Sequence, residues 1–83
     1  MNIEAQLRKY ILQNFMYTDD ESRLTRDMSL IDSGVMDSTG VLELVGFIEQ
    51  QFGFKVDDTE LVPENFDSVA KLVAFVEGKK AAA

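Results

Sequence analysis

The sequence predicts an all-α domain of four helices, three main helices and one short helix. In three segments, apolar residues recur at intervals of three and four, which is the one-sided spacing of an amphipathic helix. Apolar and polar residues do not alternate with the period of two that indicates a strand. The chain has 83 residues, enough for one hydrophobic core. We therefore expect one domain over residues 1–79 and a flexible tail at 80–83.

The first helix is predicted over about residues 3–16, because Ile3, Leu7, Ile11 and Phe15 lie four residues apart. Side chains at this spacing fall on one face of a helix. That face is expected to pack against the rest of the domain.

A long loop is predicted between residues 17 and 37, where this periodicity is lost. Turn-forming residues are frequent in it, including Asp32, Ser33 and Gly34. Apolar residues are expected to anchor the loop to the core, namely Leu24, Leu30, Ile31, Val35 and Met36. A loop of about 20 residues is unusual in a compact domain and is more often functional than accidental.

The second helix is predicted over about residues 38–52. Its apolar positions recur at helical intervals, at Val41, Leu44, Val45, Ile48 and Phe52. Gly53 stands where the end of a helix favours a residue that tolerates positive φ. Asp37 is a candidate N-cap, since its carboxylate can accept from the free N–H groups of the first turn. Ser38 would then open the helix with its hydroxyl exposed.

A short helical turn is predicted at 58–62, before Pro63, because the residue before a proline disfavours the α region. The last main helix follows, with Asp67 or Ser68 as its cap. Its apolar stripe comprises Val69, Leu72, Val73 and Val76. Gly78 and the two lysines after it suit the end of this helix.

Negative charge is concentrated in the middle of the chain. The sequence has 15 acidic and 8 basic residues, a net charge of −7, and residues 27–67 hold ten of the acids but only one base. Nucleic acid would be repelled by this segment, because phosphate binding depends on clustered Lys and Arg. We expect basic protein surfaces as partners. A solvated surface that only promotes solubility is the alternative.

The chain contains no Cys and no His. Disulfides, thiolate nucleophiles, imidazole bases and most zinc sites are therefore excluded. We predict that the protein is not an enzyme and that partner enzymes supply any catalysis. No apolar run is long enough to span a bilayer and no secretory signal is visible, so we expect a cytoplasmic protein without membrane insertion.

Three stretches of the chain, DMSLIDSGVMDS at 27–38, VLELV at 41–45 and PENF at 63–66, resemble the acyl and peptidyl carrier protein family. The resemblance spans nearly the whole chain and includes the order of the helices, the long first loop and the Asp-Ser pair that opens the second helix. An Asp-Ser pair is specific only after a Leu-x-Asp-x-Gly loop and before an apolar-periodic helix, as here. The resemblance implies an acyl-carrier-like four-helix bundle that acts as a discrete phosphopantetheine-binding carrier.

By this resemblance, Ser38 carries 4′-phosphopantetheine from coenzyme A, and Asp37 is both the helix cap and a contact of the phosphopantetheinyl transferase. A helix N-terminus favours a phosphate. The arm ends in a thiol that holds an acyl or aminoacyl group as a thioester. The other implied partners are an acyl- or aminoacyl-activating ligase and a downstream acyltransferase or synthase, all acting on a monomer. An unmodified helix cap is the alternative interpretation of Ser38.

The two residues after Ser38 depart from the pattern of fatty-acid carriers, which usually place a leucine and an acid there. Thr39 and Gly40 stand instead, and Gly40 costs up to about 1 kcal/mol of helix propensity relative to Ala. This pair is more similar to discrete carriers that serve adenylate-forming ligases, including aminoacyl and D-alanyl carriers. We therefore predict a specialised pathway. The alternatives are a housekeeping carrier of fatty-acid synthesis and an unmodified acidic helical adaptor.

We expect the partner surface to follow the second helix and the acidic segment after it. It comprises Met36, Thr39, Leu42, Glu43, Phe47, Glu49, Asp57, Asp58 and Glu60. The acids would steer basic partners, and the apolar residues would line a docking rim or hold a cargo chain, although such residues are often simply core. We expect no metal site, because a calcium loop from Asp32 to Glu43 would need oxygen ligands where Gly34 and Met36 stand.

Overall fold

The structure, a computed structural model, describes residues 2–82, without the side chain of Ala82. The four α-helices are α1 (Ile3–Ile11), α2 (Ser38–Phe52), α3 (Pro63–Phe66) and α4 (Val69–Ala82). Three single turns complete the helical structure, the π-helix η1 (Leu12–Met16) and the 3₁₀-helices η2 (Glu21–Arg23) and η3 (Asp58–Glu60). No strand occurs among these residues. The predicted all-α class, with three main helices and a short one, is confirmed.

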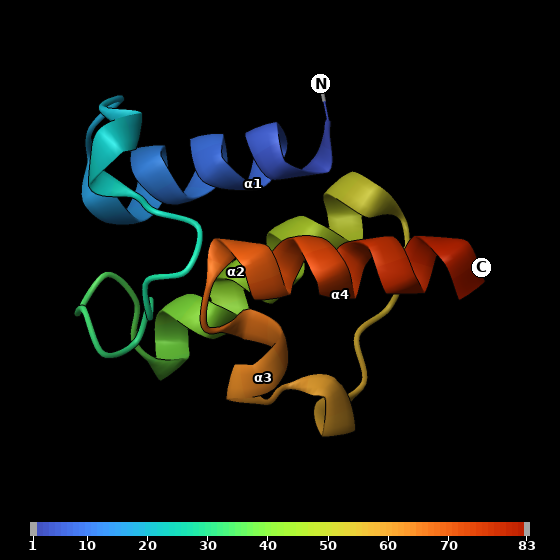
Figure 1. The fold of residues 1–83 in the computed structure, drawn as a ribbon. Coiled ribbons are helices and arrows are strands. Elements are labelled where there is room, and N and C mark those ends of the chain that lie inside the picture. Colours follow the sequence, from blue (N-terminus) through green and yellow to red (C-terminus); the bar gives the residue numbers. More distant parts are fainter. Residues whose placement is uncertain (1, 83) are drawn as a thin grey trace.

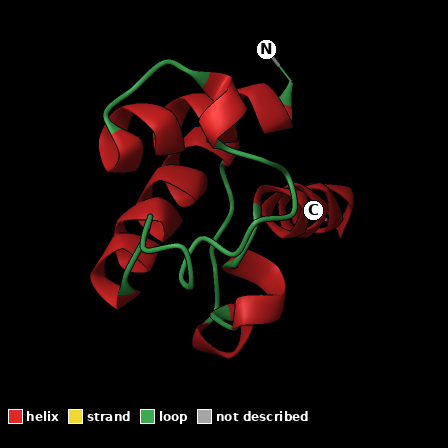
Figure 2. Cartoon of the chain, turned by 60° about the vertical axis from the view of Figure 1, so that its left-hand side comes forward, coloured by secondary structure: helices red, strands yellow, loops and turns green. Residues whose placement is uncertain are grey.

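The helices α1 and α3 both pack against α4. Figure 1 shows α1 and α4 crossing the molecule one above the other, with α2 behind them. Viewed along α4, the other helices all lie to one side of it (Figure 2). The shared core is made of Leu7, Ile11, Leu12, Leu24, Leu30, Met36, Leu44, Ile48, Phe66, Val69, Leu72 and Val76. Three of these residues come from the long loop, which is therefore part of the core as predicted.

The first helix ends in a wider turn than the sequence indicates. Helical structure extends to Met16 as expected, but residues 12–16 form the π-helix η1. Tyr17 ends it in the left-handed region at φ 55°, with its N–H donating to the carbonyl of Leu12. Bulky residues rarely adopt this conformation. The first helix therefore ends in a left-handed cap that is closed by a local backbone hydrogen bond.

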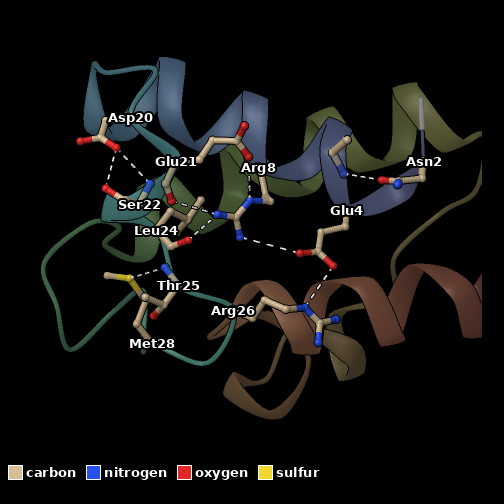
Figure 3. Close-up of polar contacts among 11 residues, drawn as sticks. Asn2, Glu4, Arg8, Asp20, Glu21, Ser22, Leu24, Thr25, Arg26 and Met28 are labelled. Atoms are coloured by element: carbon tan, nitrogen blue, oxygen red, sulfur yellow. Dashed lines mark hydrogen bonds and ion pairs between the residues drawn. The ribbon is translucent and has the colours of Figure 1, made fainter.

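Arg8 ties the first half of the long loop to α1 (Figure 3). Its guanidinium donates to the carbonyl oxygens of Glu21 and Leu24 and lies 3.2 Å from the Glu21 carboxylate. Glu4 lies 3.7 Å from Arg8 and 3.0 Å from Arg26. With η2 inside it, the segment has less irregular structure than predicted, which weakens the case for function from loop length alone.

The short α-helix lies later in the chain than the helical turn predicted at 58–62. The turn expected at 58–62 is η3 at 58–60, whereas the short α-helix α3 begins at Pro63. The sequence analysis treated this proline only as a stop. Proline is also favoured as the first helical residue, because its missing N–H has no intrahelical partner there.

The last helix is capped by Ser68, whose hydroxyl accepts from the Lys71 N–H at 3.1 Å. The prediction that this helix ends at Gly78 is wrong, because α4 continues past it to the last described residue. Lys79 and Lys80 lie over the rings of Phe54 and Phe52, at 5.7 and 5.6 Å. These contacts support the last turns of α4.

The expected tail at 80–83 falls mostly on this helix, and its last residue lies outside the described part of the chain. Its flexibility and the domain boundary at 79 remain predictions.

Candidate functional site

Ser38 opens α2 with an exposed side chain, as the sequence predicts. Asp37 precedes it in an extended conformation, and its Oδ1 accepts from the Gly40 N–H at 2.8 Å. The carbonyl oxygen of Asp37 accepts the Val41 N–H at 3.0 Å. The prediction of Asp37 as N-cap is confirmed. At the other end, Gly53 closes α2 at φ 77°, also as predicted.

A groove of about 900 Å³ opens beside Ser38. It is lined mainly by apolar side chains from η1, the long loop, the start of α2 and the segment around α3. Phe15, Val41 and Phe66 are among them, while Asp37 is the one charged residue in the lining. The serine hydroxyl therefore lies at the edge of an apolar surface depression.

The most exposed large hydrophobic side chains of the described residues all line this groove. They are Tyr17, 83% exposed, Leu42, 61%, Ile31, 42%, and Val62, 36%. These four residues are called the apolar rim below. The expectation that Ile31 anchors the loop in the core is wrong, because its side chain lies on this rim. An exposed apolar patch of this kind marks an interaction surface in many monomers.

Asp67 holds the second half of the loop next to the site. Its carboxylate accepts from the Ser29 hydroxyl at 2.8 and 2.9 Å and from the Ile31 N–H at 3.0 Å. Its carbonyl oxygen accepts from the Leu30 N–H at 2.8 Å. Asp67 is one of the two predicted caps of the last helix, but it accepts hydrogen bonds from the loop, and Ser68 caps the helix.

The environment of Asp67 favours its charged form. Partial burial opposes the charge, but the hydrogen bonds from Ile31 and Ser29 prevail and hold the pKa of the carboxyl below its usual value. A charged acceptor strengthens both bonds to the loop.

The predicted partner residues do not form one surface. Thr39, Leu42, Glu43, Asp57 and Asp58 are exposed. By contrast, Met36 is buried in the core, and the ring of Phe47 stacks on that of Tyr10 with centroids 4.0 Å apart. In the present conformation, Met36 and Phe47 are therefore packing residues.

Two of the predicted acids are engaged within the chain. Glu49 accepts from the Val56 N–H at 2.8 Å. Glu60 accepts from the Asp57 N–H at 2.9 Å and pairs with Lys79 at 3.0 Å, and these two contacts, in that order, lower the pKa of the Glu60 carboxyl. These carboxylates hold η3 and the end of α2 in place, and they lie away from the groove.

Gly40 is the tightest point of the site and one that the sequence analysis judged only by helix propensity. It is buried, and a Cβ at this position would lie 2.9 Å from Met36 Cγ and 2.9 Å from Phe15 Cε1. Any larger residue would require a neighbour to move. The signal was present in the sequence, since a glycine in the first turn of a helix is unfavourable unless close packing requires it.

Among residues 2–82 no group of acidic side chains is arranged to hold a metal ion. In the same part of the chain, no helix has the length and apolar character needed to cross a membrane.

A four-helix domain that presents a serine at a capped helix start, beside an apolar groove, belongs to the class of small helical carrier domains. Residues 5–76 match the family described as "Phosphopantetheine attachment site". The chain belongs to this family, that of the acyl and peptidyl carrier proteins. Members of the family carry a covalently attached 4′-phosphopantetheine and interact with phosphopantetheinyl transferases and other enzymes.

Individual relatives agree with this assignment. The chain is 40% identical over 60 residues to an acyl carrier protein of Thermotoga maritima, which covers 72% of each chain. It is 36% identical over 77 residues to a D-alanyl carrier protein of Streptococcus pyogenes, covering 93% of this chain and 94% of the relative. The predicted resemblance and the carrier role with a phosphopantetheine arm are confirmed.

Two solved structures have the same fold. The solution structure of a holo acyl carrier protein from Nitrosomonas europaea superposes with a TM-score of 0.79 at 26% identity, covering 98% of this chain and 99% of the other. The apo structure of KstB-PCP superposes with a TM-score of 0.78 at 32% identity, covering 95% and 87%. The acyl-carrier-like four-helix bundle is therefore confirmed.

Proposed function

We propose that Ser38 is the residue that carries the phosphopantetheine arm. The observation that supports this most is its exposed hydroxyl at the first position of α2, directly beside the groove. The N-terminus of a helix accommodates a phosphodiester well, because its N–H groups and dipole favour negative charge. The apolar groove offers the arm and its cargo a surface that is partly shielded from water. The residues present therefore fit the group.

The chain cannot attach the arm by itself. Asp37 is the carboxylate nearest in sequence to Ser38, and its Oδ1 already accepts from Gly40 as the helix cap. A transferase that binds coenzyme A and Mg²⁺ must therefore deprotonate and orient the hydroxyl. When bound, the arm supplies a thiol, which carries an acyl or aminoacyl group as a thioester. In this proposal the chain is a carrier on which other enzymes act, and is not an enzyme itself.

The test is incubation of the purified chain with coenzyme A, Mg²⁺ and a broad-specificity phosphopantetheinyl transferase, followed by intact mass measurement. We expect one phosphopantetheine increment on the wild type and none on Ser38→Ala. Ser33→Ala, which removes another exposed serine hydroxyl, is the matched control and should be modified as the wild type is. An unmodified but folded wild type, tested with more than one transferase, would support the unmodified acidic adaptor instead.

We propose further that an adenylate-forming ligase loads the arm with an acyl or aminoacyl group in a specialised pathway. Two observations favour this over fatty-acid synthesis. The residues after Ser38 are Thr39 and Gly40, and the similarity to a D-alanyl carrier protein covers nearly the whole chain. The close packing of Gly40 also leaves no room at this position for an acidic side chain.

A loading experiment distinguishes a carrier of aminoacyl groups from a carrier of fatty-acid synthesis. The phosphopantetheinylated chain is incubated either with D-alanine, ATP and a D-alanine-activating ligase or with malonyl-CoA and a malonyl transferase, and masses are compared. We expect the aminoacyl increment to form faster. Loading only with the malonyl group would instead support a carrier of fatty-acid synthesis.

The enzymes that act on Ser38 must contact the surface around it. We propose that they dock on the apolar rim, which includes Leu42, and on the neighbouring residues Thr39 and Glu43. These partners are the transferase, the activating ligase and a downstream acyltransferase or synthase. Asp57 and Asp58 act at longer range by steering basic enzymes. We propose that the chain works in the cytoplasm as a monomer, without binding nucleic acid or inserting into a membrane.

A further inference from the structure

The contact between Phe15 and Gly40 joins the end of the first helix to the first turn of α2. The edge of the Phe15 ring occupies the space that a side chain at position 40 would take, since Cε1 lies 2.9 Å from an ideal Cβ there. The N–H of the same glycine donates to Asp37. Gly40 is thus held by the helix cap and packed against both the Phe15 ring and the Met36 side chain, only two residues after Ser38.

Phe15 is itself held in place by its neighbours. It lies in the π-helix η1, which places more residues in each turn than an α-helix and so changes the direction of the side chains along it. Its ring meets that of Tyr10 edge to face, with centroids 5.9 Å apart, and the Tyr10 ring stacks on Phe47 of α2. The contact with this aromatic group therefore restricts how the Phe15 ring can move.

We propose that Phe15 is a positioning residue for the modification of Ser38, acting through Gly40. This inference rests on the proposed role of Ser38. By packing directly on a glycine, Phe15 fixes the backbone of the first turn of α2 and so fixes the direction in which the serine hydroxyl points. A small displacement of a reacting group costs much of a reaction rate, because the enzyme must hold both reactants in one geometry. Phe15 also lines the groove beside Ser38, but it is not one of the exposed apolar-rim residues on which partner enzymes are proposed to dock.

The test measures kcat and KM for transfer of phosphopantetheine from coenzyme A to the wild type, Gly40→Ala, Phe15→Leu and the double variant. We expect Gly40→Ala to lower kcat about tenfold or more with KM for the carrier nearly unchanged. In the double variant, Phe15→Leu removes the ring edge that the new methyl group would meet, whereas Met36 Cγ stays 2.9 Å from the same position, so kcat should recover in part. If Gly40→Ala only lowered stability, its kcat would equal that of the wild type at a temperature where it is fully folded. Phe15→Leu would then have no loss of kcat to restore.

Gly46→Ala is the matched control. Gly46 lies in the same helix, and a Cβ there meets nothing within 4 Å. This variant should be modified at the wild-type rate, and circular dichroism should show all variants folded at the assay temperature.

The proposal is overturned if Gly40→Ala is modified at the wild-type kcat, or if the folded double variant stays as slow as Gly40→Ala. If Gly40→Ala fails to fold, the double variant decides alone: a folded double variant that is modified supports the pairing, whereas one that also fails to fold overturns it. Failure of the proposed role of Ser38 is a different result, in which the wild type gains no mass at all.

Discussion

The two ends of α2 differ in how their side chains are used. At its start, Ser38, Thr39 and Leu42 are exposed, and Ser38 and Leu42 line an apolar groove. At its end, Glu49 accepts from a backbone N–H and the Phe52 ring lies under Lys80. One end offers unpartnered side chains to other molecules, whereas the other end is occupied by contacts within the chain.

This difference shows that charge composition alone does not locate a docking surface. The sequence places most of its acids in one segment, but two of those predicted to meet partners, Glu49 and Glu60, stabilise the fold. The apolar rim has no comparable partner among the described residues and lines the same groove as Ser38. If Ser38 carries the arm as proposed, exposed apolar area next to it is therefore a stronger guide to the docking surface than charge.

The largest effect is expected from a charge placed on the apolar rim. Leu42→Lys should lower kcat/KM for phosphopantetheine transfer about 30-fold. The reason is that binding of the transferase would bury the lysine charge in an apolar interface and remove it from water. Gln50→Lys adds the same charge at an exposed position near the other end of α2 and should change the rate far less. Equal losses in both variants would contradict the difference between the two ends.

A smaller effect is expected where the loop is tied beside the groove. Asp67→Asn should lower the free energy of unfolding by about 1 kcal/mol, because it weakens charge-assisted hydrogen bonds from Ser29 and Ile31. Urea unfolding at pH 7 measures this. Asp32→Asn, which alters an exposed acid of the same loop, is the control and should unfold as the wild type does.

The Asp67→Asn variant also tests how the charge of Asp67 contributes to the pH dependence of the free energy of unfolding. The pKa of Asp67 is lowered in the folded state, so its contribution to stability is present above the ordinary carboxyl pKa of about 4 and is lost as the pH falls through the folded value. The stability difference between wild type and Asp67→Asn should therefore shrink as urea unfolding is repeated at decreasing pH below about 5. A constant difference would show that the charge of Asp67 is unimportant.

The smallest effect is expected from the acids outside the groove. Asp58→Lys should slow modification about twofold at low salt and less at high salt, because it weakens steering without touching the site. Asp19→Lys reverses an exposed charge in the loop after α1 and serves as the comparison. A rate that depends neither on this charge nor on salt would rule out steering by Asp58.

The elements that repeat a local pattern could be predicted from the sequence. The spacing of apolar residues gave α2 from Ser38 to Phe52, and the side-chain chemistry of Asp37 and Gly53 gave its two caps. Pro63 was misread because a proline both ends one helical turn and begins the next, and neighbouring residues do not distinguish the two. Ile31 was wrongly expected in the core because the apolar character of a loop residue does not show whether its side chain faces the core or the solvent.

The sequence by itself determined that this chain is a helical carrier with a serine at the start of its second helix. Helix periodicity, capping and the Asp-Ser motif are local properties, fixed by residues within a few positions of each other. Only the tertiary structure decided that Phe15 packs on Gly40, that Asp67 holds the loop and that an apolar rim lines the groove beside Ser38. The first two contacts join residues 25 or more positions apart, and the geometry of all three features depends on how the helices pack against one another.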